Sequence, residues 1–237
     1  ANVENARQAT ASLLQAEQNQ LNDLVTIFAE RPTLRRLVQT GALAELPPFM
    51  AAFQAQSKVD LLLFCQTNGE RVAGSTVLAQ CPAVTPPQFM LIAGQPALVV
   101  SRAVQANPPE TQLGIATAAL WLDQPFLQQM AANTGAEANI VTTTGQGLTS
   151  SIADGSQPTL SPLASAATAQ AKLTLAGQPY YVVYLPLSQQ AGPAPFGVAV
   201  ALPVADLIVT ERRALLILVT STSLVALLGV VLATGYV

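Results

Sequence analysis

Five residues carry side chains that suit the binding of a small molecule. Arg102, in an expected strand, would pair with a ligand carboxylate, and Trp121, the single tryptophan, would stack on a ligand. Asp123 would hold an amine. Tyr180 and Tyr184 would lie on one face of a strand, because side chains alternate from face to face along a strand. These five residues are the candidate ligand contacts.

Each candidate also has a purely structural explanation. Arg102 would be an outward-facing strand charge, Trp121 a packed core residue and Asp123 the N-cap of the helix that follows it. Tyr180 and Tyr184 would belong to the edge of a sheet or to a dimer contact. The sequence leaves both interpretations open.

The composition argues against catalysis and against nucleic-acid binding. The chain has no histidine, which removes Ser-His-Asp and Cys-His catalysis, histidine-ligated haem and histidine-containing zinc sites. Glycine-rich phosphate-binding motifs are absent, and Glu137 and Asp154 lie in or beside expected loops without the carboxylate partner that a hydrolase needs. The net charge of -3 with scattered cations provides no footprint for nucleic acid. We expect a non-enzymatic chain without metal or cofactor.

Two cysteines, Cys65 and Cys81, give information on the cellular compartment in which the chain lies. They do not form a CxxC pair, and metal binding would require more ligands than the sequence offers nearby. A disulfide between them would need an oxidising compartment and would contribute roughly 3 kcal/mol by the loop-entropy model. The alternative is two buried free thiols. With a disulfide, the bulk of the chain would be extracytoplasmic.

A membrane anchor is expected at the C-terminal end. Residues 214–237 carry no charge, and a helix of that length would extend about 36 Å, enough to cross the lipid bilayer. Arg212 and Arg213 precede the run on its external side, against the positive-inside preference. Residues 1–10 do not resemble a signal peptide, so we expect a signal or a first transmembrane helix before Ala1. The predicted location is the cell membrane.

A long helix is expected at the N-terminus. Leu14, Leu21 and Phe28 recur every seven residues on one face, and Pro32 predicts a break. This stripe would pack on the rest of the chain, form a homodimer seam, or do both.

The rest of the chain contains an internal repeat. The residues Ala93-Gly94-Gln95-Pro96 recur 83 residues later as Ala176-Gly177-Gln178-Pro179, and at the same offset Gly114-Ile115-Ala116 matches Gly197-Val198-Ala199. A strand–glycine turn–strand hairpin at Asn68-Gly69 has a counterpart at Thr144-Gly145. Repeated elements in one order predict two compact units of antiparallel sheet.

The order of these elements resembles the double Cache family, the tandem PAS-like extracytoplasmic sensor domains of bacterial receptors. The motifs that carry the resemblance are residues 29–34, 61–70, 120–127 and 196–203. The resemblance implies an α+β fold with an N-terminal helical segment (1–57), a membrane-distal PAS-like unit (58–134), a membrane-proximal PAS-like unit (135–210) and a transmembrane helix (214–237). The motif with which family members bind amino acids has no clear copy here.

The resemblance also implies a function. The chain would sense a small-molecule ligand, act as a homodimer through its N-terminal helix, and signal through the transmembrane helix to a cytoplasmic output module beyond Val237. The alternative is a membrane-anchored structural or accessory subunit that presents a protein-binding surface.

Overall fold

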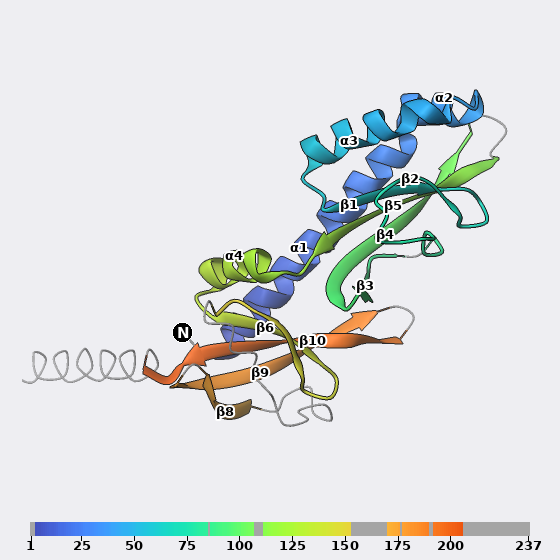
Figure 1. The fold of residues 1–237 in the computed structure, drawn as a ribbon. Coiled ribbons are helices and arrows are strands. Elements are labelled where there is room, and N and C mark those ends of the chain that lie inside the picture. Colours follow the sequence, from blue (N-terminus) through green and yellow to red (C-terminus); the bar gives the residue numbers. More distant parts are fainter. Residues whose placement is uncertain are drawn as a thin grey trace, which may run out of the picture.

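One long helix packs against two β-sheets that have the same strand order. The computed structural model describes residues 3–84, 86–106, 111–152, 170–175, 177–189 and 192–205. The fold is α+β, and α1 runs along both sheets, with its N-terminal end near the end of the last strand (Figure 1). The helices are α1 (Val3–Glu30), α2 (Pro32–Gln39), α3 (Leu46–Ser57) and α4 (Gln124–Thr134), with a short 3-10 helix at Leu43–Glu45.

The seven-residue stripe of α1 is buried within the chain itself. Leu14, Leu21 and Phe28 are 3%, 0% and 0% exposed, because this face of the helix packs on the sheets. A dimer through α1 would therefore have to use the opposite, mainly polar face of this helix, on which the large hydrophobic side chain of Ile27 is 54% exposed. The helix ends at Glu30, just before the break predicted at Pro32, and that proline occupies the first turn of α2.

The repeat is confirmed by the topology, since both sheets have the same strand order. The first sheet, ordered β2-β1-β5-β4-β3, consists of β1 (Leu61–Cys65), β2 (Arg71–Gly74), β3 (Gln88–Ile92), β4 (Gln95–Gln105) and β5 (Gln112–Trp121). The second sheet, ordered β7-β6-β10-β9-β8, consists of β6 (Glu137–Thr142), β7 (Gly147–Ser150), β8 (Gln170–Leu175), β9 (Gln178–Gln189) and β10 (Gly192–Pro203).

The predicted equivalence of Gly114 and Gly197 is wrong by one residue of strand register. Ala97 pairs with Trp121 in the first sheet and its counterpart Tyr180 pairs with Pro203 in the second, so β5 and β10 correspond at an offset of 82, not 83. A shift of one residue turns a side chain to the other face of a sheet. Gly114 and Gly197 accordingly face opposite sides and are not equivalent: Gly114 lies against the ring of Phe64, and Gly197 against the ring of Tyr184.

A single hydrophobic core joins the two units. It includes Leu21 and Phe28 of α1, and it reaches from Leu62 on the inner face of the first sheet to Val198 on the inner face of the second. The outer faces hold separate, smaller clusters. Between the sheets, Phe89 on β3 and Phe196 on β10 are 2% and 1% exposed, and their rings meet edge to face with centroids 6.3 Å apart.

The expected disulfide is present. Cys65 on β1 and Cys81 in the β2–β3 connection are bonded, with Cα atoms 5.9 Å apart. The backbone N–H of Cys81 also donates to the Gly69 carbonyl at 2.9 Å. Leu78, in the same connection, packs against the apolar clusters on the outer face of the first sheet. The disulfide therefore fastens this connection over that face.

The expected membrane-spanning run, residues 214–237, lies outside the described residues. Among the residues that are described, no helix is both long enough and apolar enough to cross a bilayer.

Candidate ligand-binding site

Two of the five candidate residues line one cleft. Trp121 and Asp123 lie where β5 leads into α4, beside Asp60 at the entrance to β1. The cleft has a volume of about 340 Å³ and is closed on its other side by α1, which contributes Glu17 and Gln20. A space of this size accommodates a small organic molecule.

The local structure of this cleft follows from its sequence. Asp123 caps α4 as expected, because its Oδ1 accepts a hydrogen bond from the backbone N–H of Phe126 at 3.1 Å. The Oδ2 atom of Asp60 accepts a hydrogen bond from the backbone N–H of Trp121 at 2.7 Å. These two bonds hold two carboxylates at the same end of the sheet, next to a partly buried indole that packs against Leu61 and Ala119.

The cleft carries both signs of charge, with an acidic excess. Glu17, Asp60 and Asp123 line it together with Lys58. Burial raises the pKa of Asp60, the hydrogen bond from Trp121 opposes this shift, and the negative charge of Asp123 adds to it. The arrangement favours a ligand with a positively charged group near these carboxylates and an apolar part against Trp121 and the adjacent aromatic side chain of α4.

Replacing Asp60 by asparagine tests the electrostatics of the cleft. The folded protein holds the Asp60 proton more tightly than the unfolded chain does, because the folded pKa is raised. The stabilisation from Asp60 is therefore present below the unfolded pKa and lost as the pH rises through the folded pKa. We expect Asp60→Asn, which keeps an oxygen acceptor for the Trp121 N–H, to gain stability relative to the wild type between about pH 3 and 6.

Urea denaturation across that pH range measures the effect. Asp23→Asn, on the exposed side of α1, is the control for loss of a carboxylate. A stability difference between wild type and Asp60→Asn that stayed constant with pH, or moved in the opposite direction, would contradict the assignment.

Arg102 lies elsewhere and already has a partner. Its guanidinium donates to the side-chain oxygen of Asn22 on α1, and also to the backbone carbonyl of Ser101 at 3.4 Å. Arg102 does not line the cleft that contains Trp121 and Asp123. In this structure the side chain connects β4 to the long helix.

Tyr180 and Tyr184 lie on the outer face of the second sheet and are 7% and 8% exposed. They share that face as expected, whereas Tyr181 is 36% exposed and lies near the Lys172 ammonium. The Tyr184 ring lies directly against Gly197, and burial raises the pKa of its hydroxyl. The structure therefore does not bring the tyrosines together with Trp121 and Asp123.

Gly197→Ala tests the close packing at Tyr184. A Cβ atom at position 197 would lie 2.2 Å from the Tyr184 hydroxyl oxygen, so the ring would have to move. We expect a loss of about 1–3 kcal/mol in the free energy of unfolding, the usual cost of overpacking. Adding Tyr184→Ala should recover part of the Gly197→Ala loss, and an additive double variant would contradict the contact.

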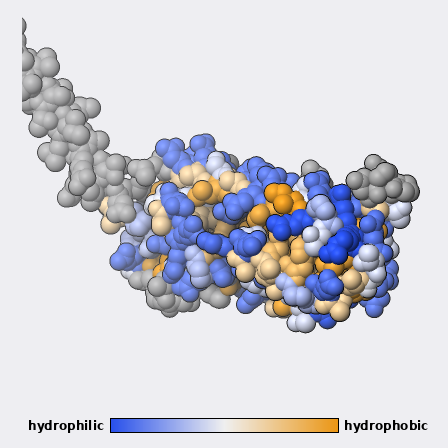
Figure 2. Space-filling view, turned by 90° about the horizontal axis from the view of Figure 1, so that it is seen from above, coloured by the Kyte–Doolittle hydropathy of each residue, from blue (hydrophilic) through white to orange (hydrophobic). Residues whose placement is uncertain are grey.

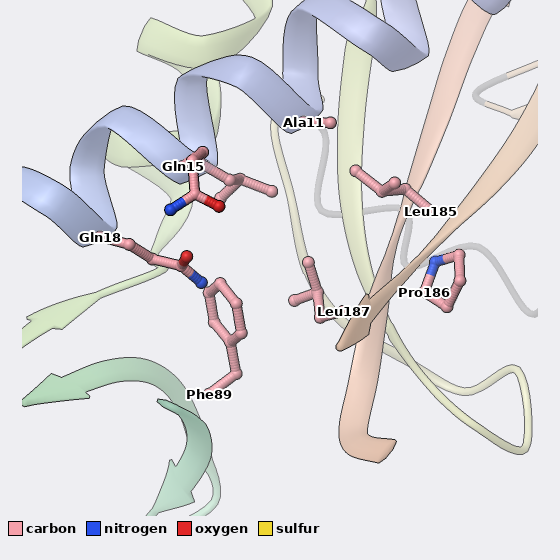
Figure 3. Close-up of a pocket in the computed structure, with 8 residues that line it drawn as sticks. Ala11, Gln15, Gln18, Phe89, Leu185, Pro186 and Leu187 are labelled. Atoms are coloured by element: carbon pink, nitrogen blue, oxygen red, sulfur yellow. The ribbon is translucent and has the colours of Figure 1, made fainter. Parts of the chain in front are cut away.

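A second cleft lies at the joint between the units (Figure 3). It is lined by one side of α1, by Phe89 of β3 and by the β9 residues Leu185, Pro186 and Leu187. Gln18 of α1 extends toward the ring of Phe89, and Leu187 faces them from β9 (Figure 3). Its volume of about 150 Å³ is smaller than that of the Asp60 cleft.

Sequence reasoning missed Asp60 and the residues of this second cleft. Asp60 gave a weak signal, as a charged residue directly before an apolar strand. The second cleft gave none, because its walls come from segments far apart in the sequence.

Two sheets of this strand order on one long helix define the double Cache, or tandem PAS-like, sensor fold, as the sequence resemblance implied. The structure is similar to the periplasmic domain of LuxQ from Vibrio cholerae, with 11% sequence identity and a TM-score of 0.63, covering 85% of this chain and 100% of that one. The sensor domain of the histidine kinase DctB from V. cholerae matches with 11% identity and a TM-score of 0.54, covering 84% and 95%.

A third similar structure is the ligand-binding domain of the Campylobacter jejuni chemoreceptor Tlp3 in complex with 4-methylisoleucine. It has 12% identity and a TM-score of 0.51, and the match covers 87% of this chain and 89% of that one. The sequence itself matches no protein-family model and no curated protein. At these low identities the likeness concerns the fold.

Proposed function

We propose that this chain is the extracytoplasmic ligand-sensing region of a transmembrane signalling receptor. A ligand-induced change would pass through the C-terminal transmembrane helix to a cytoplasmic output module. The observation that carries the proposal is the single core that runs from the first sheet, along α1 and across the Phe89–Phe196 contact, to β10. The fold shared with periplasmic sensor domains supports it.

The ligand in this proposal is a small molecule bound in the Asp60 cleft. Trp121 would contact its apolar part, and Asp60 and Asp123 would pair with its cationic group. The Tlp3 domain, which has the same fold, was solved with 4-methylisoleucine bound, a small molecule that carries an amine. An amine-bearing metabolite fits the acidic excess of this cleft.

The route of the signal follows from the packing. The cleft lies between α1 and the β5–α4 connection, and α1 contacts both sheets, including β10. A ligand that changes the position of α1 would change the packing of β10, the last strand before residues 206–237. It can do so only by binding one of two arrangements more tightly than the other.

The remaining parts of the proposal concern location and assembly. The disulfide supports an oxidising, extracytoplasmic compartment for the units at 58–134 and 135–210. We propose that residues 214–237 span the lipid bilayer and that two copies associate through the exposed face of α1. The sensing region itself is not an enzyme in this proposal.

One observation favours the alternative of an accessory subunit with a protein-binding surface. Val77 and Val84, 48% and 45% exposed, lie on the disulfide-fastened connection, and Leu91 on the edge strand β3 is 37% exposed. Seen from above, hydrophobic areas interrupt the hydrophilic surface (Figure 2). A partner protein that bound to this side of the chain would cover these side chains, whereas a ligand-sensing role does not require them to be covered.

A thermal-shift screen of the purified chain tests the sensing proposal. Amino acids, amines, organic acids and purines form the panel, and one class should raise the melting temperature in a saturable way. At a concentration about 100 times Kd, the ligand would add about 2.7 kcal/mol to the free energy of unfolding. Asp123→Asn, which retains the helix cap, should weaken the effect. No response to any class would contradict the proposal and favour the accessory subunit.

A further inference from the structure

The Asp60 cleft has carboxylates on two separate walls. One wall is the end of the first sheet, where Asp60 and Asp123 lie close enough for the negative charge of Asp123 to raise the pKa of Asp60. The opposite wall is α1, which contributes Glu17. The charge of Glu17 does not take part in the pKa shift of Asp60, in keeping with its place on the other wall. The cleft therefore offers two distinct positions for a positive charge.

The chain itself leaves these carboxylates without a cationic partner. Each aspartate accepts one hydrogen bond from the backbone, from the N–H of Trp121 or of Phe126. Within the part of the chain that the structure describes, Glu17 makes no hydrogen bond and no ion pair. Lys58 also lines the cleft, but within the same described part it forms no ion pair with any of the three. Three carboxylates and one ammonium leave the cleft with two negative charges in excess.

The rest of the lining is largely apolar. Its apolar side chains come from α1, β5 and α4, and they are Leu24, Leu120, Trp121, Pro125 and Phe126. A smaller cavity of about 30 Å³ continues the cleft between α1 and α4, because Glu17, Phe126 and Gln129 line both spaces. The Glu17 carboxylate thus has room around it. An apolar chain with a charged group at each end matches this distribution of side chains.

We propose that the cleft selects a ligand with two ammonium groups joined by a short methylene chain, and that Glu17 is the residue that determines this specificity. One ammonium pairs with Asp60 and Asp123, the other pairs with Glu17, and the methylene chain lies against Trp121. This inference rests on the proposed sensing function and names the class of ligand for its cleft. A free diamine and a basic amino acid such as lysine both carry this chemistry.

Charge complementarity separates this class from other amines. A dication neutralises the two negative charges in excess, whereas a monoamine that pairs with Asp60 and Asp123 leaves Glu17 without a counter-charge. An amino acid with a neutral side chain adds no net positive charge. In a basic amino acid the additional carboxylate would pair with Lys58, which lines the same cleft.

The second ammonium also gives the ligand a contact with each wall. A diamine connects α1, through Glu17, to the end of the first sheet, and α1 in turn contacts both sheets. Such a ligand binds best where the two walls are at one particular separation, so it distinguishes between two arrangements of α1. A monoamine held by the two aspartates makes no ion pair with α1.

Isothermal titration calorimetry of the purified chain tests the specificity with matched probes. They are 1,4-diaminobutane and butylamine, which share a four-carbon chain and differ in the second ammonium group. We expect the diamine to bind about tenfold more tightly or better, since a hydrogen bond to a charged group contributes at least that much. L-lysine and 1,5-diaminopentane differ only in the carboxylate, so their relative affinities identify which source of the shared chemistry fits better.

Variants of the charged lining assign the effect to Glu17. Glu17→Gln preserves the size of the side chain and should lower the affinity for 1,4-diaminobutane to that for butylamine, with butylamine unchanged. Lys58→Gln removes the competing cation and should strengthen diamine binding. Glu30→Gln makes the same chemical change at an exposed position of α1 outside the cleft and should bind as the wild type does.

Three results would overturn this specificity. They are equal affinities of the wild type for 1,4-diaminobutane and butylamine, a Glu17→Gln variant that retains the preference for the diamine, and no binding of either amine. The sensing proposal is judged separately, because it fails only if no class of metabolite in the thermal-shift screen stabilises the chain.

Discussion

Phe196→Ala is expected to lower the free energy of unfolding by about 3–5 kcal/mol, the range for a buried phenylalanine cut back to alanine. The side chain is 1% exposed and belongs to the core shared by both units. Its ring contacts Phe89 of the first sheet, so the change removes packing within the second sheet and between the sheets. Phe126→Ala, at a half-buried position on α4, is the control and should cost less.

A double-mutant cycle with Phe89→Ala isolates the contact between the units. An edge-to-face aromatic pair contributes about 0.5–1.5 kcal/mol beyond the burial of its area, so the two losses should be non-additive by that amount. Urea denaturation of the four proteins gives the coupling energy. Strict additivity, or two separate unfolding transitions in the wild type, would show that the units do not share one core.

Removal of the disulfide is expected to cost about 3 kcal/mol, because the unfolded chain regains the freedom of the closed loop. Cys65→Ala combined with Cys81→Ala avoids leaving a free thiol. The loss should be accompanied by faster hydrogen exchange of the backbone amide at position 81, which in the wild type donates to the Gly69 carbonyl.

The wild type under reducing conditions provides a matched comparison. Dithiothreitol should lower its stability by a similar amount and should leave the double variant unchanged. If the reductant has no effect on the wild type, the disulfide does not constrain the unfolded chain as the structure requires.

The elements with strong local signals were predictable. The Leu14–Leu21–Phe28 stripe predicted α1, because a seven-residue spacing places all three side chains on one face of a helix. Asp123 and Gly135 predicted where α4 begins and ends. An aspartate N-cap and a left-handed glycine C-cap depend only on backbone atoms close by in the sequence. The spacing of the repeated residues indicated two similar sheets, which the structure confirms.

Register and faces were harder to predict. The match of Gly114 with Gly197 looked like an equivalence, but one residue separates them in register and they face opposite sides. A repeated tripeptide does not show how many residues lie in the turns and bulges between the strands. The pairing with neighbouring strands sets the register, and this pairing involves residues that are far apart in the sequence.

The site was predictable only in part. Trp121 and Asp123 line a common cleft, but Asp60, which directly precedes the neighbouring strand β1, joins them only through the pairing of β1 with β5. The contact of Arg102 with Asn22 depends on how α1 crosses β4.

In the proposed signalling route, ligand binding in the Asp60 cleft changes the packing of β10. Hydrogen exchange of the β10 amides, measured with and without the ligand selected by the thermal-shift screen, tests this most directly. We expect altered protection in β10 and along α1, with the β10 change weakened in Phe89→Ala. Ligand binding that changes protection only at the residues lining the cleft, with β10 unaltered, would contradict the claim.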